Sequence, residues 1–212
     1  AQTFVSAIVG GTVSELSGGK FANGAMTSAF AWAFSSAVNG AYRTGRGSSS
    51  GSATKRGLTD GEVDLVQNYY GESVPYEDIK LALDPGGKYI ARTIGSSIKY
   101  RNSDFYSSDF STATPQLQSI FLHEVMHIWQ NENIPRYTAA AAGMEHILYK
   151  DPYAYTFDAS RSLKSYRYEQ QAQIMEDFVY AQQRGITMIG GTPVGSYSSM
   201  IYGSVTNIYK AP

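Results

Sequence analysis

The sequence contains no cysteine, which excludes a disulfide framework and any thiolate nucleophile or ligand. It also lacks an excess of charge: 17 Lys and Arg against 18 Asp and Glu leave a net charge of −1. Without a field of one sign, we expect no binding to nucleic acid. Histidine is scarce, with three residues in 212. Any imidazole chemistry must therefore come from His123, His127 and His146.

What is present is a globular composition, 42% hydrophobic and 17% charged, with room for one medium domain and an appendage. Residues 1–42 form a Gly-, Ala- and Ser-rich segment whose charges are Glu15 and Lys20, and we expect small-residue helices there. The run 21–38 approaches the length of a membrane span. Its polar residues, with Asn23 and three serines among them, favour a helix packed on protein over a membrane contact.

Residues 43–57, "RTGRGSSSGSATKRG", read as a flexible linker, because Gly and Ser give a coil that four basic residues keep solvated. The candidate functional residues therefore lie in a domain at 58–212. The chain begins with Ala1 and shows no basic stretch followed by an apolar run, so we expect no signal peptide. These features indicate a segment cut from a longer protein.

The sequence pattern of residues 58–212 predicts an α+β fold, with a small antiparallel sheet beside a helical bundle. Thr59 and Glu62 form a capping-box pattern for a first helix, and Thr114 followed by Pro115 opens a helix that runs to about 133. Further helices are expected at about 138–149 and 167–184. Strands are expected within 78–83 and, as one or two strands, within 88–101. The tail predicts at most short strands.

The stretch "FLHEVMHIWQ" at 121–130 carries the chemistry. His123 and His127 are one helical turn apart, a spacing at which two imidazoles can bind one metal ion. Glu124 lies next to that face, within reach of a metal-bound water. The alternative is a pair of core histidines bonded to backbone, since a helix that is apolar on most sides is buried.

A catalytic zinc site needs a third protein ligand and an open position for water. Gln130 and Asn133 replace the glycine and histidine of the metzincin pattern, which excludes that class. His146 is one candidate ligand on the next helix. A glutamate from "YRYEQQAQIMEDF" is another, and Glu169 and Glu176 are seven residues apart on one face. Geometry alone leaves these two glutamates open.

Three stretches, "LTDGEVDLVQNYYGESVPYEDIKLAL", "FLHEVMHIWQ" and "YEQQAQIMEDF", resemble the zinc metallopeptidase toxin domain at the C-terminus of some type VI secretion VgrG spike proteins and Rhs proteins. In that family the glutamate that opens "EQQA" is the third ligand, which implies Glu169 here. Thermolysin-like gluzincins have an acidic residue four positions later. This chain has Gln173 there and Asp177 one turn on, so the outer partners of the ligands depart from that pattern.

Residues 9–40 resemble a segment that precedes toxin tips in Rhs and related polymorphic toxins. The resemblances imply a zincin-like fold, a Zn²⁺ cofactor and a secreted effector of interbacterial competition that is delivered into a target cell, with the periplasm as the implied compartment. They also imply a VgrG spike or Rhs core as carrier, and a cognate immunity protein as partner.

The mechanism we expect is hydrolysis of a peptide bond by zinc-activated water, with Glu124 as general base. An extended substrate would pair with the strand at about 96–100, if that strand offers a free edge. Four side chains are candidates for stabilising the oxyanion, and the sequence does not rank them: Tyr155, Tyr166, Tyr168 and His146.

Two other classes remain open from the sequence. One is a non-catalytic tip or adaptor module that zinc stabilises, although a purely structural site has no need of Glu124. The other is a membrane-active toxin that works through residues 1–42, which leakage of liposomes by that segment would reveal.

Overall fold

The computed structural model describes residues 55–85 and 87–205. The predicted segment 1–42 and most of the predicted linker lie outside them. The described part is α+β, as expected. Its α-helices are α3 (Asp60–Tyr70), α4 (Pro115–Asn133), α5 (Ala139–Leu148), α6 (Tyr168–Gln183) and α7 (Val194–Val205). Its strands are β1 (Lys80–Leu83), β2 (Ala91–Ile94), β3 (Ser97–Tyr100), β4 (Met188–Ile189) and β5 (Thr192–Pro193), and its short 3₁₀ turns are η2 (Tyr76–Asp78), η3 (Phe110–Thr112) and η4 (Leu163–Ser165).

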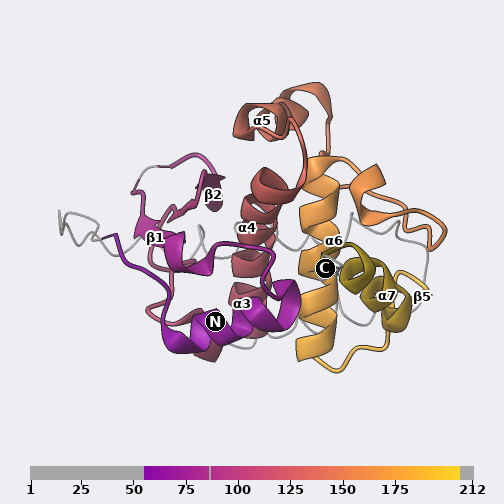
Figure 1. Cartoon of the computed structure of the whole chain (residues 1–212), viewed down its shortest axis with the longest axis horizontal. Helices are drawn as coiled ribbons and strands as arrows, with labels where there is room; N and C mark the ends of the chain where they lie inside the picture. The colour runs from indigo at the N-terminus through magenta and orange to yellow at the C-terminus, as the bar shows by residue number, and fades with distance from the viewer. Residues whose placement is uncertain (1–54, 86, 206–212) are drawn as a thin grey trace, which may run out of the picture.

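Helices α4 and α6 lie side by side through the middle of the molecule (Figure 1). The three-stranded sheet packs on one flank of α4 through β2, and α7 packs on α6. Helix α3 crosses below this pair, whereas α5 lies at its opposite end (Figure 1). Every residue of α4 from 121 to 130 is buried, so the HExxH stretch lies in the core. Among the described residues, no helix combines the length and apolarity of a membrane span.

The helix ends follow the capping signals of the sequence. The Thr59 side chain accepts from the N–H of Glu62, whose carboxylate accepts from the N–H of Thr59, so the predicted capping box is present. The Thr114 side chain accepts from the N–H of Leu117, with proline at the first helical position. These bonds satisfy N–H groups that a helix start leaves without partners, which is why these boundaries were predictable.

The main sheet corrects two expectations. Its order is β1-β3-β2, with β1 parallel and β2 antiparallel to β3, so the sheet is mixed rather than antiparallel. The strand expected to offer a free edge, at about 96–100, is β3 and lies in the centre. The reason is the tight turn at Gly95, where φ is +57°: it folds β2 onto one side of β3 and leaves the other side to β1. The edge beside α4 is β2.

Helix α7 was not predicted, although the β4–β5 hairpin matches the expected short strands. Its sequence, "VGSYSSMIYGSV", contains two glycines and four serines, which are weak helix formers. Tyr197, Ile201 and Val205 nevertheless repeat at helical spacing and are buried. Packing of that face therefore outweighs the local preference.

Arg56, assigned to the linker by composition, belongs to the folded domain. Its backbone pairs with Leu81, and its guanidinium donates two hydrogen bonds of 2.7 and 2.8 Å to the buried carboxylate of Glu62. Folded structure therefore begins before residue 58.

Candidate metal centre and its cavity

Three side chains converge between α4 and the first turn of α6. Nitrogens of His123 and His127 and a carboxylate oxygen of Glu169 all lie within 4.8 Å of one another. Oε2 of Glu169 is 3.7 Å from Nε2 of His123 and 3.6 Å from Nε2 of His127. All three residues are buried. The helical spacing brings the two imidazoles to one face of α4, and the α4–α6 contact brings the carboxylate opposite.

This donor set fits a zinc ion. Zinc binds imidazole nitrogen and carboxylate oxygen at about 2.0–2.2 Å in tetrahedral sites, which separates two ligand atoms by about 3.4 Å. The distances from Glu169 to the two imidazoles, 3.7 and 3.6 Å, are close to that separation and too long for hydrogen bonds. Among the described residues, no further histidine or carboxylate joins this group of three, which matches a metal site that keeps one position open.

The outer nitrogen of each imidazole lies close to a side-chain oxygen. Oε1 of Gln130 lies 2.9 Å from Nδ1 of His127. Oε2 of Glu176 lies 2.9 Å from Nδ1 of His123, although off the line along which an Nδ1–H bond would point. Such contacts orient a ring so that its inner nitrogen faces the metal. Of the two glutamates left open by the sequence, Glu169 thus joins the histidines and Glu176 lies behind one of them.

Helix α5 holds Glu169 from the other side. Nε2 of His146 lies 3.1 Å from Oε1 of Glu169, the oxygen that does not face the histidine pair. The two carboxylate oxygens of Glu145 accept from the backbone N–H groups of Tyr168 and Glu169, at 3.0 and 3.1 Å. A carboxylate at a helix N-terminus is favourable because it satisfies free N–H groups. Two consecutive residues of α5 therefore fix the position of Glu169.

Glu124 faces the same region and is buried as well. Its Oε2 accepts a hydrogen bond of 2.7 Å from Oγ1 of Thr93, on the edge strand β2. Both Glu124 and Thr93 line the cavity that the two histidines and Glu169 also line.

Burial and mutual charge shift the pKa values of this cluster. Burial lowers the pKa of His123, but Glu169 and Glu176 outweigh it and hold that pKa well above its usual range. The pKa of His127 is raised in the same way by Glu169. Burial would raise the pKa of Glu169, yet His127 and His123 hold it well below its usual range. The pKa of Glu124 is raised by burial. In the metal-free protein, the Glu169 carboxylate therefore favours the protonated forms of the two imidazoles, and a bound metal ion would have to displace those protons.

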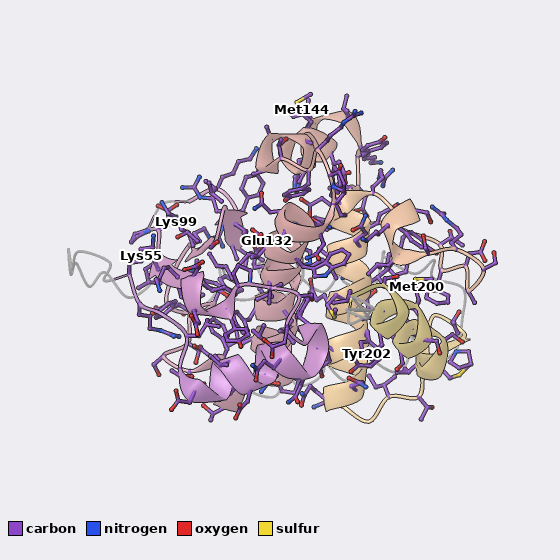
Figure 2. The ribbon with its side chains drawn as sticks, viewed as in Figure 1. Lys55, Lys99, Glu132, Met144, Met200 and Tyr202 are labelled. Carbon is purple, nitrogen blue, oxygen red and sulfur yellow. The ribbon has the colours of Figure 1, made fainter. Side chains whose placement is uncertain are left out.

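The cavity has a volume of about 230 Å³. Its walls are the edge strand β2 on one side and α5 on the other, with the HExxH face of α4 and Glu169 between them. Three tyrosines complete the lining: Tyr89, Tyr137 and Tyr153. In the middle of α5 the side chain of Met144 is exposed and points away from α4 and α6 (Figure 2).

Several predicted residues lie elsewhere. The hydroxyl of Tyr155 donates to Asp177 at 2.6 Å, and Gln173 donates to the other oxygen of Asp177 at 3.0 Å. The hydroxyl of Tyr166 accepts from the N–H of Asp158 at 2.9 Å, and the ring of Tyr168 packs edge-on against that of Tyr137. None of Tyr155, Tyr166 or Tyr168 is among the residues that line the cavity, so these three are not placed to act on a substrate there.

His146 does line the cavity, as expected of one oxyanion candidate. No sequence motif pointed to Thr93, Tyr89, Tyr137 or Tyr153, because they come from a strand and loops outside any motif. The abundance of tyrosine, 17 residues, was a general signal but did not distinguish these from the rest.

The chain is similar in sequence to a known protein and in fold to a solved structure. No family model matches the chain. The type VI secretion system spike protein VgrG2b of Pseudomonas aeruginosa is 28% identical over 129 residues, which are 58% of this chain and 13% of the spike protein. The solved effector domain of Pseudomonas aeruginosa VgrG2b matches with a TM-score of 0.56 and 24% identity, over 84% of this chain and 98% of that domain. The chain is thus similar in sequence to part of a type VI secretion spike protein, and it shares the fold of that protein's effector domain.

Proposed function

We propose that this domain is a zinc-dependent peptidase with a zincin-like, gluzincin-type site, in which His123, His127 and Glu169 hold the metal. The convergence of these three buried ligands on one cavity, with Glu124 beside them, carries the proposal. A buried HExxH pair with a glutamate ligand from a second helix is typical of this chemistry.

Bound zinc would supply Lewis acidity and lower the pKa of a water molecule toward neutrality. Glu124 would take a proton from that water as it attacks a peptide carbonyl, and would then deliver the proton to the leaving amine nitrogen. Burial raises the pKa of Glu124, which brings it nearer to the neutral range in which a general base works best.

Developing charge on the carbonyl oxygen needs a donor in addition to zinc. Tyr137, Tyr153 and His146 line the cavity and are the candidates. Burial raises the pKa of both tyrosines above their usual value, so their hydroxyls keep the hydrogen that a donor needs. Strand β2 replaces β3 as the expected substrate edge, where an extended peptide would pair through its backbone.

The relationship to a spike-protein effector domain supports a role as a secreted effector. Delivery by a VgrG spike or Rhs core into a target bacterial cell, action in the periplasm, and neutralisation by a cognate immunity protein follow from this role and belong to the proposal.

The deciding experiment measures zinc by elemental mass spectrometry in the full chain, purified without added metal. We expect about one zinc per chain in the wild type and its loss in Glu169→Ala. Glu176→Ala should still bind added zinc, with affinity reduced about 10- to 100-fold, because Glu176 only orients His123. Absence of zinc from the wild type, or its retention in Glu169→Ala, would overturn the site.

A second experiment distinguishes a catalytic zinc from one that only stabilises the fold. Glu124→Gln should keep its zinc and lose the growth inhibition that the wild type causes when it is directed to the periplasm of test bacteria. A variant that binds zinc and is as toxic as the wild type would instead favour a zinc-stabilised module, or toxicity that arises in residues 1–42.

A further inference from the structure

Thr93 contacts the proposed general base twice. Its Oγ1 is 2.7 Å from Oε2 of Glu124 and 3.1 Å from the backbone oxygen of the same residue. Thr93 lies on β2, the edge strand that packs against α4. A side chain of the substrate-facing strand thus holds both the backbone and the carboxylate of Glu124.

A threonine hydroxyl has one hydrogen, so it can donate to only one of these oxygens at a time. The shorter contact goes to the carboxylate, and a bond to a charged acceptor is the stronger of the two. Glu124 is 6% exposed, so water cannot readily replace this donor. The hydroxyl therefore fixes one carboxylate oxygen toward β2.

We propose that Thr93 is a positioning residue for Glu124, holding Oε2 so that Oε1 is presented to the cavity as the proton acceptor. The inference rests on the proposed peptidase function. One proton moves from the attacking water to Oε1 of Glu124, and later from Oε1 to the leaving amine nitrogen. Thr93 keeps its own hydrogen throughout and donates to Oε2 in both states.

The position of Thr93 also links substrate and base. The Thr93 contact joins β2 to α4 at Glu124. It therefore sets the distance between Glu124 and a peptide that pairs with the free edge of β2. Loss of the hydroxyl should therefore impair the chemical step more than binding.

The test compares zinc-loaded full chains of the wild type, Thr93→Val and Thr93→Ser on fluorescently labelled casein. Valine keeps the shape of threonine and removes the hydroxyl. We expect Thr93→Val to lower kcat about 10- to 100-fold with little change in KM and normal zinc content, and Thr93→Ser to restore most of the rate. Thr192→Val, the same change at a half-buried position of β5, should behave as the wild type.

A crystal structure of zinc-loaded Thr93→Val gives a readout that does not depend on activity. The Glu124 carboxylate should leave its place beside residue 93, while His123, His127 and Glu169 stay in position. Unchanged kcat or an unmoved carboxylate in Thr93→Val would overturn the inference, as would a serine variant as slow as the valine variant. If Glu124→Gln cleaves casein like the wild type, or the wild type does not cleave it, the proposed function fails instead.

Discussion

At the scale of single residues, Gln130 is notable for using both ends of a fully buried amide. Its oxygen lies 2.9 Å from Nδ1 of His127, and its nitrogen donates to the backbone oxygen of Tyr168 at 2.9 Å and to Gln171 at 3.2 Å. It thus orients a proposed ligand on α4 and ties it to the start of α6.

Gln130→Leu should weaken zinc binding about 10- to 100-fold and lower the free energy of unfolding of the metal-free protein by about 1–3 kcal/mol. The cause is that His127 and the Tyr168 carbonyl lose a partner that buried water cannot replace. Competition with a zinc-sensitive dye and urea denaturation would measure the two effects. Gln182→Leu, an exposed change on α6, is the control, and equal losses in both variants would contradict this role.

The sequence was informative for residues inside the HExxH motif, because helix geometry alone places His123, Glu124 and His127. It could not separate Glu169 from Glu176, since both lie on one face of α6 and only the offset between α4 and α6 decides between them. Thr93 was inaccessible for a similar reason: its contact with Glu124 spans 31 residues and depends on the order of strands in the sheet.

At the scale of elements, the start of α3 is held by one buried carboxylate. Glu62 is 0% exposed and accepts from the backbone N–H groups of Thr59 and Phe110, at 2.9 and 2.8 Å, besides the two bonds from Arg56. A single side chain therefore joins α3, η3 and the first described residues.

Glu62→Ala should lower the free energy of unfolding by about 2–4 kcal/mol, since a buried and a part-buried N–H group lose their acceptor and the Arg56 guanidinium loses its ion-pair partner. This expected loss of stability is smaller than the loss from breaking a fully buried ion pair, because the Arg56 side chain is 23% exposed. Thermal and urea denaturation would measure it, with the exposed Asp64→Ala as control. A loss no larger than that of the control would show that solvent satisfies these groups.

Elements with strong local signals were predicted, and those that depend on packing were not. Threonine caps and a first-turn proline located α3 and α4 within a residue or two. Helix α7 lacks such signals, and the mixed order of the sheet follows from which strand pairs with which, a long-range property that alternation within a strand does not encode.

At the scale of the whole molecule, zinc should stabilise the domain in a pH-dependent way. The raised pKa values of His123 and His127 mean that their protonated forms stabilise the metal-free fold at acid pH, a contribution lost as pH rises through those values. Zinc needs neutral imidazoles, so its own contribution grows over the same interval.

The difference in Tm between zinc-loaded and metal-free protein should therefore increase as pH rises from below the ordinary histidine pKa of about 6.5 to above it. Free zinc at 100 times its Kd would contribute about 2.7 kcal/mol. Calorimetry across this range, with and without a chelator, would measure the difference. A difference that is constant with pH would indicate that the imidazoles do not bind the ion.

The consecutive residues Glu145 and His146 connect the proposed metal centre to α5, a helix at the surface of the molecule. Through them, the ion would set the amide exchange rate of a peripheral helix that contributes no ligand. In hydrogen-exchange mass spectrometry, peptides from 139–148 should exchange more slowly when zinc is bound, because the ion fixes Glu169, which both residues contact. Equal exchange in both states would mean that α5 is anchored independently of the centre. Slower exchange would mean that the amides of α5, at the surface, report whether zinc is bound in the interior.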